Sequence, residues 1–361
     1  MALTFGGCAP RPEEPGLENP PGAVFSGRRG SMLAVVLAAG HGRRLHPLTD
    51  DRSKATLPVA GRPMVERVME MLARGGADRF IVVVHPDDRA LVEHFSQPRW
   101  AGRVRLAYQE QRLGMAHALE CAVPLIREDG APEFILSSCD NLFPEGHVAA
   151  LVARRREERL DAALTLIRVR PEQAPTLAVI VLEGGRVTHI VEKPRPGEAL
   201  SNLGSVALYV LSTRVLDYLP QVPLSPRGER EFPDALRLLI EDGGRVGGLL
   251  VPWRMTLTRP EDLLALNRYF LRHDPTCATV EADLPSDASI IPPVRIEAGV
   301  KLGSGCRIGP EVYLEACSRV GAGATLRRAV ILRGAIVEAD VVIEGSVRCC
   351  SSPAIGQRHT T

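Results

Sequence analysis

The stretch "MLAVVLAAGHGRRLHPLTDDRSKATLPV" (residues 32–59) leads from an apolar run into two glycines and several cations. Its first eight residues are mostly small or β-branched, as is typical of a strand covered on both faces. Gly40 and Gly42 let the backbone turn sharply and point N–H groups one way, which suits phosphate oxygens. Arg44 and Lys54 add the charge that a triphosphate needs. The stretch predicts a phosphate site, whereas the glycine turn alone also fits a plain strand-to-helix connection.

Apolar strands alternate with amphipathic helices on both sides of this turn, up to about residue 169. The expected strands are residues 32–39, 80–84, 104–109 and 134–138, with helices at residues 63–74 and 115–125 among the segments between them. This succession predicts an open, mainly parallel sheet whose ligands bind outside the carboxyl ends of the strands.

The alternation of strands and helices gives way to a different pattern after residue 161. Longer strands are expected at residues 162–169 and 203–211 and in a hairpin over residues 177–193, followed by helices at residues 232–241 and 260–270. We expect these elements to form a β-rich layer beside the parallel sheet, within the same domain.

A six-residue repeat occupies the C-terminal part of the chain. Apolar residues recur at Ile296, Leu302, Ile308, Leu314, Val320, Leu326 and Leu332. Seven hexads in phase, with three hexads to a coil, predict a left-handed parallel β-helix. The phase slips by one residue near Val337, and Ile343 resumes it.

The composition excludes several classes of protein. Of 361 residues, 45% are hydrophobic and 24% are charged, which is ordinary for a globular protein. A balance of 44 Lys and Arg against 43 Asp and Glu leaves no global field to attract nucleic acid or a membrane surface. No apolar run reaches the roughly 18 residues that a membrane span needs. The eight cysteines contain no CxxC pair, so reduced thiols and a cytoplasmic location are expected.

These patterns divide the chain into five expected parts. They are a disordered extension (residues 1–31), an α/β domain (32–272), a linker (273–286), the β-helix (287–348) and a tail (349–361).

The opening stretch resembles the signature L-[AG]-[AG]-G-x-G-x-R-[LM]-x-P-[LM]-T of the nucleoside-diphosphate-sugar pyrophosphorylases, or sugar-1-phosphate nucleotidyltransferases. That family continues with a Lys about ten residues after the Arg and then with L-P, as this chain does at Lys54. The resemblance implies an α/β fold with a Rossmann-like domain and a mainly parallel mixed sheet. It also implies an Mg²⁺-dependent transfer from an NTP to a sugar 1-phosphate, with release of pyrophosphate. Arg44 and Lys54 would be catalytic, and Leu37 and Ala39 would contact the nucleotide with Gly40 and Gly42.

Later segments resemble the family's other motifs in the same order. "YQEQRLGMAHAL" makes Gln109 and Gly114 candidates for contact with the base, and "ILSSCDNLF" makes Asp140 the candidate Mg²⁺ ligand. "IVEKP" makes Lys193 a candidate for the sugar phosphate and Glu192 for the sugar hydroxyls. "SNLGSVALY" adds Asn202 on the sugar side. Taken singly, these residues also fit a polar strand end, a helix cap and a surface ion pair.

The chain departs from the family pattern at four places. Cys139 stands where a glycine usually precedes the metal-binding Asp, and Ala178 and Ala207 replace glycines near the sugar. In "WRMTLTRPEDLLALN", Thr256 occupies the place of the second metal-binding Asp. A threonine offers a neutral oxygen without the charge, so we expect weaker metal binding there.

The resulting prediction is a cytoplasmic sugar-1-phosphate nucleotidyltransferase that uses glucose 1-phosphate with dTTP or UTP. A regulatory subunit that binds nucleotide sugars without catalysis is the first alternative, and Thr256 is its main support. A bifunctional enzyme with an acetyltransferase on the β-helix is the second, although the short repeat disfavours it. Stacked β-helix coils present flat apolar edges, so a homo-oligomer through the β-helix is expected.

Overall fold

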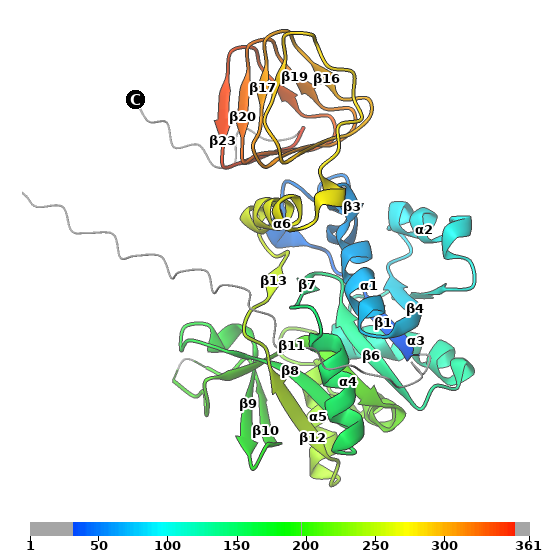
Figure 1. The fold of residues 1–361 in the computed structure, drawn as a ribbon. Coiled ribbons are helices and arrows are strands. Elements are labelled where there is room, and N and C mark those ends of the chain that lie inside the picture. The colour runs from blue at the N-terminus through cyan, green and yellow to red at the C-terminus, as the bar shows by residue number, and fades with distance from the viewer. Residues whose placement is uncertain (1–31, 196, 351–361) are drawn as a thin grey trace, which may run out of the picture. The chain divides into compact units, whose positions relative to one another are not determined.

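The protein was analysed as a computed structural model that describes residues 32–195 and 197–350. The extension predicted for residues 1–31 and most of the tail predicted for residues 349–361 lie outside the described residues. One mixed sheet of nine strands organises the α/β part (Figure 1). In spatial order its strands are β5 (Val104–Tyr108), β4 (Ala77–Val84), β1 (Met32–Leu37), β6 (Glu133–Ser138), β11 (Leu203–Ser212), β8 (Ala162–Arg168), β12 (Val246–Leu250), β10 (Arg186–Glu192) and β9 (Ala178–Glu183).

The four strands β5, β4, β1 and β6 are parallel to one another, as predicted. The expectation of a separate β-rich layer is wrong. β11 runs antiparallel beside β6 and β8 pairs with β11, so the later strands extend the same sheet. A sequence pattern reports which residues of a strand are buried, but it does not report which strand lies next to it.

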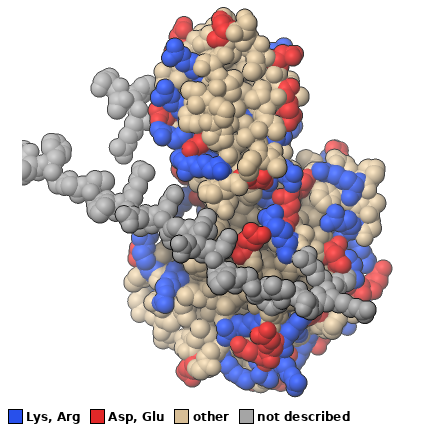
Figure 2. All heavy atoms as spheres, in the orientation of Figure 1, with Lys and Arg blue, Asp and Glu red and all other residues tan. Residues whose placement is uncertain are grey.

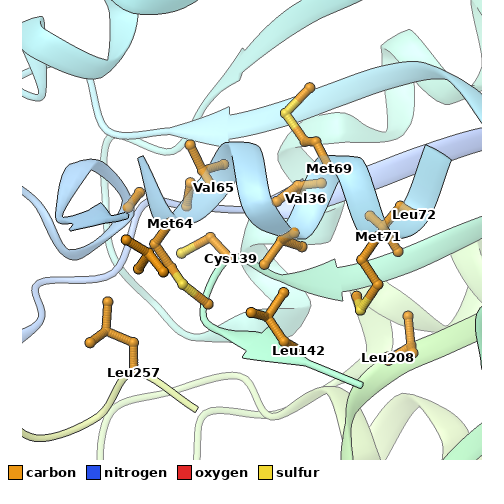
Figure 3. Close-up of a cluster of buried hydrophobic side chains, with 14 of the residues drawn as sticks. Val36, Met64, Val65, Met69, Met71, Leu72, Cys139, Leu142, Leu208 and Leu257 are labelled. Atoms are coloured by element: carbon orange, nitrogen blue, oxygen red, sulfur yellow. The ribbon is translucent and has the colours of Figure 1, made fainter. Parts of the chain in front are cut away.

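Helices cover both faces of this sheet. Ala34 and Val36 of β1 belong to the core formed with α1 (Met64–Arg74) and α4 (His147–Glu157), and Figure 3 shows Val36 beside the side chains of α1. Leu33 and Val35 belong to the opposite core, formed with α3 (Met115–Asp129) and α5 (Phe232–Glu241). The alternation along β1 confirms a strand buried on both faces.

The predicted helices are present, with three changes at their ends. The last helix, α6 (Pro260–His273), continues three residues beyond the expected end at Phe270. Pro63 lies in β3 (Arg62–Pro63) and precedes α1, so it is outside the first turn in which it was expected. α3 continues through Pro124 to Asp129 because Ile126 still packs in the core, and Gly130 ends it with a φ of 74°.

The remaining elements are short except for helix α6, which has 14 residues. They are α2 (Arg89–Phe95), α6 (Pro260–His273), β2 (Pro58–Val59), β7 (Asn141–Leu142), β13 (Met255–Thr256), and the 3-10 helices η1 (Arg43–Leu45), η2 (Lys54–Thr56), η3 (Pro98–Trp100), η4 (Ala174–Thr176), η5 (Thr213–Gln221) and η6 (Pro275–Cys277). η6 lies in the predicted linker, and Cys277 within it is buried. The predicted domain boundaries themselves stay predictions.

Three parallel sheets form the predicted left-handed β-helix (Figure 1). They are β14 (Ser289–Ile290) with β17 (Arg307–Ile308), β20 (Thr325–Arg327) and β23 (Val342–Glu344); β15 (Val294–Ile296) with β18 (Val312–Leu314), β21 (Val330–Ile331) and β24 (Val347–Arg348); and β16 (Lys301–Leu302) with β19 (Arg319–Val320) and β22 (Ile336–Val337). The hexad side chains from Ile296 to Leu326 point into one apolar core, with Leu302 partly buried at its edge.

The position predicted for the phase slip is wrong. Leu314 pairs with Ile331 and not with Leu332, so the missing residue lies between Leu326 and Ile331. From Ile331 the spacing of six continues through Val337 to Ile343. Both Ile331 and Leu332 are buried and apolar, so composition alone could not choose between them.

Two further observations concern the surface. None of the helices within residues 32–195 and 197–350 is both long and apolar enough to cross a membrane. On the face that Figure 2 shows, basic and acidic side chains are interspersed. This distribution agrees with a net charge of +1, so any anion site must come from a local cluster of cations.

One buried histidine links fold stability to pH. His147 begins α4 with a side chain that is almost fully buried, and its Nε2 lies 3.0 Å from Oγ1 of Thr165. Burial lowers the pKa of His147 to about 4. The unfolded chain therefore takes up a proton at a higher pH than the folded chain does, and stability falls as the pH falls from about 6.5 towards 4.

We predict that the wild-type protein loses on the order of 1–2 kcal/mol of unfolding free energy through His147 between pH 7.5 and pH 5. The free energy of unfolding, measured with urea at both pH values, checks this. In His147→Gln the decrease between pH 7.5 and pH 5 should be smaller by the same amount. His189→Gln is the control because His189 is exposed on β10. An equal pH dependence in wild type and His147→Gln would contradict the assignment.

Candidate active site

The glycine turn packs directly against the segment that carries Lys54. Gly42 has a φ of 66°, and Oγ1 of Thr49 donates to its carbonyl oxygen at 3.2 Å. A Cβ on Gly42 would lie 3.1 Å from Cβ of Lys54. A side chain at this position would therefore be strained and would press on Lys54. A Cβ on Gly40 would meet nothing within 4 Å.

An ion pair joins Lys54, in the 3-10 helix η2, to Asp140, just after the end of strand β6. Asp140 follows β6, and the glycine turn follows β1, which lies parallel to β6. Nζ of Lys54 lies 2.5 Å from Oδ2 of Asp140, and the two side chains are 19% and 15% exposed. Asn141 donates to Oδ1 of Asp140 at 2.9 Å and to Oγ of Ser138 at 2.8 Å.

Both partners of this ion pair remain charged. Burial opposes the charge on Lys54, but the Asp140 carboxylate outweighs it and holds the pKa of Lys54 above its ordinary value. Burial likewise favours protonation of Asp140, yet the Lys54 ammonium and the hydrogen bonds keep the pKa of Asp140 below its usual range. The site therefore keeps a fixed cation next to a fixed carboxylate.

A cavity of about 370 Å³ opens over the glycine turn, and its lining is strongly basic. Its lining residues are His41, Gly42, Arg43, Arg44, Leu45, Lys54, Arg112, Arg227, Gly228, Glu229 and Thr258. Nε of Arg112 donates to the carbonyl oxygen of Ala39 at 2.7 Å, which holds Arg112 beside the turn. Burial, with Arg112 and Arg43 nearby, lowers the pKa of His41. Five cations around one cavity suit a polyanion.

The two residues predicted to contact a base lie together. Gln109 is buried at the end of β5, and its Nε2 donates to the carbonyl oxygen of Gly114 at 3.1 Å. Gly114 has a φ of 93°, and a Cβ there would lie 2.7 Å from the backbone oxygen of Arg230. Only glycine fits this position. Leu37 ends β1.

The predicted sugar-side residues form a second charged group. Lys193 follows β10 in the left-handed region (φ 46°), and its Nζ lies 3.0 Å from Glu192 and 3.3 Å from Glu231. Arg227 pairs with Glu231 at 2.6 Å, which links this group to the basic cavity. Burial raises the pKa of Glu192, and the Glu231 carboxylate acts in the same direction.

Asn202 is in neither charged group. It is exposed just before β11, where its backbone oxygen accepts a hydrogen bond from Val169 at 2.9 Å.

The described side chains around Asp140 do not form a set of ligands that could hold a metal ion in the absence of nucleotide. β13 pairs with β7, so Thr256 lies opposite Asn141, and Oγ1 of Thr256 lies 3.0 Å from Oγ1 of Thr258. Nη1 of the partly buried Arg254 donates to Oδ1 of Asn141 at 2.8 Å. Within residues 32–195 and 197–350, no three His, Cys, Asp or Glu side chains are grouped to hold a metal ion. One paired carboxylate, a neutral hydroxyl and an arginine do not fit a metal held by protein carboxylates.

Cys139, the unexpected residue before Asp140, has a structural explanation. Its side chain is buried in the core beside α1 (Figure 3). Burial raises the pKa of the Cys139 thiol to about 12, so it behaves as a small apolar side chain.

Sequence reasoning missed five charged residues of this region. They are Arg43, Arg112, Arg227, Glu231 and Arg254. Arg43 and Arg112 lie inside quoted motifs and could have been found as extra cations near the turn. Arg254 also lies inside a quoted motif, WRMTLTRPEDLLALN, whereas Arg227 and Glu231 lie outside every motif, and only the folded chain brings them to the site.

Comparison with known proteins identifies the family. A family model described as "Nucleotidyl transferase" matches residues 33–251. UTP--glucose-1-phosphate uridylyltransferase AglF of Haloferax volcanii is 34% identical over 233 residues, which are 64% of this chain and 93% of that protein. Glucose-1-phosphate thymidylyltransferase of Streptomyces griseus is 31% identical over 91% of this chain and 92% of its own length.

Two further comparisons give weaker likenesses, one to a sequence and one to a solved structure. The bifunctional protein GlmU of Methanococcus maripaludis is 29% identical, with 61% of its length matched. The structure of a UDP-glucose pyrophosphorylase complexed with UDP-glucose superposes with a TM-score of 0.60 at 21% identity, over 67% of this chain and 99% of that one. That likeness supports the fold alone. The predicted resemblance is confirmed: the chain belongs to the nucleotidyl transferase family.

Proposed function

We propose that this chain is a sugar-1-phosphate nucleotidyltransferase that converts an NTP and a sugar 1-phosphate to an NDP-sugar and pyrophosphate. The basic cavity over the glycine turn is the observation that carries the proposal. It offers cations for a triphosphate, and Lys54 at its base is fixed by Asp140. Preorganised cations of this kind stabilise charge that develops during phosphoryl and nucleotidyl transfer.

The reaction assigns a role to each cation. An oxygen of the sugar phosphate attacks the α-phosphorus in line and forms the new P–O bond, while the bond to the β-phosphate oxygen breaks. Pyrophosphate leaves with the electron pair of that bond. In the proposed mechanism Lys54 stabilises the transferring α-phosphate, and Arg44 stabilises the triphosphate and the leaving pyrophosphate.

The remaining predicted residues bind the two substrates. Lys193 would hold the sugar phosphate, and Glu192 and Asn202 would accept hydrogen bonds from sugar hydroxyls. Lys193 and Arg227 both pair with Glu231. This arrangement supports the assignment, because the residues proposed to bind the sugar phosphate then lie next to the basic cavity. The base would lie against Gly114 and bond to Gln109.

The nucleoside would pass over the backbone of the glycine turn. Leu37, Ala39, Gly40 and Gly42 form this backbone path. Glucose 1-phosphate with UTP or dTTP is the proposed substrate pair, and the named activities of the Haloferax and Streptomyces relatives support it.

Members of this family generally use a divalent metal. We propose that Mg²⁺ reaches this site as the counterion of the NTP, with Asp140 as the nearest protein carboxylate. The poor fit of Asp140, Thr256 and Arg254 to a resident ion supports entry of the metal with the nucleotide.

Thr256 also favours the alternative of a regulatory subunit that binds nucleotide sugars. A neutral side chain beside Asn141 is what a degraded metal site would show. The acetyltransferase alternative has less support. Successive strands from β14 to β24 are joined by two to four residues, so this β-helix has no inserted loop.

The expected homo-oligomer and cytoplasmic location remain proposals. Ile336 of β22 and Val342 of β23 are 64% and 67% exposed on the last strands of two β-helix sheets. An apolar edge of this kind supports self-association through the β-helix.

We predict pyrophosphate release with Mg²⁺ and one substrate pair in a matrix of four NTPs and four sugar 1-phosphates. Lys54→Ala and Asp140→Asn should each lower the rate by about a hundredfold or more, because each removes one partner of the fixed ion pair. Binding of NDP-sugar without release of pyrophosphate from any pair would favour the regulatory subunit.

Gly42→Ala should lower kcat by about tenfold or more, because the new methyl group displaces Lys54. The matched control is Gly130→Ala, since Gly130 also has a positive φ (74°) but faces open space at the end of α3. Each variant should cost about 1 kcal/mol of stability. If both variants keep wild-type kcat, Gly42 does not position Lys54.

Thr256→Asp should increase the affinity of the nucleotide-free protein for Mn²⁺ by about tenfold, because it adds the missing carboxylate. Electron paramagnetic resonance of free Mn²⁺ during a protein titration measures this. Thr176→Asp adds the same charge at an exposed position of η4 and should change nothing. Strong Mn²⁺ binding by the wild type would contradict the proposed entry of metal with the nucleotide.

A further inference from the structure

We propose that the β-helix positions the catalytic lysine, through an ion pair between Glu315 and Arg52. Arg52 precedes Lys54 by two residues, whereas Glu315 follows β18 of the β-helix. The inference rests on the proposed role of Lys54. It makes Arg52 and Glu315 positioning residues, which touch no reacting atom.

The Arg52–Glu315 pair is buried and well aligned. Nη1 of Arg52 lies 2.6 Å from Oε1 of Glu315, and the side chains are only 9% and 4% exposed. Burial opposes the charge on Arg52, but Glu315 and, to a lesser extent, Asp51 together outweigh it and raise the pKa of Arg52. The exposed Asp51 also pairs with Arg52, with its Oδ1 3.3 Å from Nε, but Nη1 loses its buried acceptor when Glu315 is removed. The guanidinium then shifts towards Asp51 and solvent, and the backbone that carries it follows.

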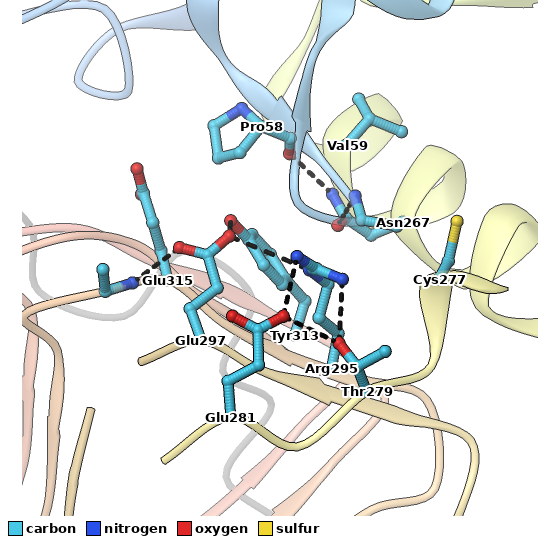
Figure 4. Close-up of polar contacts among 12 residues, drawn as sticks. Pro58, Val59, Asn267, Cys277, Thr279, Glu281, Arg295, Glu297, Tyr313 and Glu315 are labelled. Atoms are coloured by element: carbon cyan, nitrogen blue, oxygen red, sulfur yellow. Dashed lines mark hydrogen bonds and ion pairs between the residues drawn. The ribbon is translucent and has the colours of Figure 1, made fainter. Parts of the chain in front are cut away.

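Glu315 is held rigidly by the β-helix itself. Its second carboxylate oxygen accepts the backbone N–H of Arg333 at 2.8 Å, and its own N–H donates to Ile331 at 2.9 Å. On the preceding coil, Glu297 accepts hydrogen bonds from Tyr313 at 2.7 Å and from the backbone of Ala316 at 3.0 Å (Figure 4). The carboxylate that receives Arg52 therefore has little freedom.

The other end of the Lys54 segment is fixed by helix α6. Asn267 is buried, donates to the carbonyl oxygen of Pro58 at 3.1 Å, and accepts the N–H of Ala60 at 2.7 Å (Figure 4). Residues 52–60 are thus held at both ends, with Lys54 between them. Removal of the β-helix contact frees the end that lies only two residues from Lys54.

The same β-helix offers a matched control. Glu311 pairs with Arg268 and Arg272 of α6 at 2.6 Å each, and it is 11% exposed. It therefore joins the β-helix to the α/β part as Glu315 does, but it contacts α6 instead of the segment that carries Lys54. Loss of either carboxylate weakens the attachment of the β-helix, and only loss of Glu315 should misplace Lys54.

The experiment compares Glu315→Gln with Glu311→Gln in the full-length chain. We expect Glu315→Gln to lower kcat by about tenfold or more while KM for the NTP stays within about twofold, and Glu311→Gln to leave both within about twofold. Hydrogen exchange of peptides covering residues 50–57 should accelerate in Glu315→Gln alone. Equal losses of kcat in both variants, or unchanged exchange in Glu315→Gln, would overturn the proposal.

A second pair of variants, at Arg52, distinguishes a folding defect from the loss of the ion pair. Arg52→Lys keeps the charge and should retain more of kcat than Arg52→Met, with thermal melts showing that both fold; equal activity of the two overturns the proposal. If the wild-type chain releases no pyrophosphate, the proposed function fails by itself. Hydrogen exchange of residues 50–57 then decides whether Glu315 fixes the segment.

Discussion

The ion pair between Lys54 and Asp140 is the contact on which the arrangement of the site depends. Asp140 comes just after β6, and Lys54 begins η2 on the segment that leads away from β1, so the pair depends on β1 and β6 lying side by side in the sheet. Both charges are largely buried, and a partner left alone would have to give up its charge or find another counterion. The glycine turn closes over Lys54, and β7 begins directly after Asp140. The sheet and the glycine turn therefore together set the geometry of the site.

Much of the fold could be predicted because the periodicity of a strand or a helix is a local property. The strands β1, β4, β5, β6 and β8 to β11 and the helices α1, α3, α5 and α6 follow patterns that can be read within about fifteen residues, whereas the glycine-containing strand β12 was not predicted. The two errors concern non-local choices. The continuation of the sheet from β6 to β11 depends on which edge was free, and the pairing of Ile331 instead of Leu332 depends on the coil beneath it. Neither choice changes the burial pattern that a sequence displays.

The site was predictable only where charge and motif coincide in the sequence. Lys54 and Asp140 were found because each stands in a quoted motif, and the structure brings them within 2.5 Å of each other. Arg254 and Glu315 carry equally well-placed charges. Arg254 was not singled out within its motif, Glu315 lies outside the motifs, and each acts through a partner that is distant along the chain. A lone Arg or Glu in a sequence is most often an exposed residue, so its role appears only with its partner.

The charge balance around Asp140 bears on how metal and nucleotide enter. The carboxylate faces Lys54 directly and Arg254 through Asn141, and Thr256 adds no charge. The nearby cavity adds further arginines, so the region carries an excess of positive charge. A divalent cation alone would increase this excess, whereas a nucleoside triphosphate would neutralise it and supply the oxygen ligands that Mg²⁺ prefers. Binding of the metal and binding of the nucleotide should therefore favour each other. A site with two protein carboxylates could hold a metal before the nucleotide arrives, whereas here Asp140 supplies one carboxylate and Thr256 opposite Asn141 is neutral.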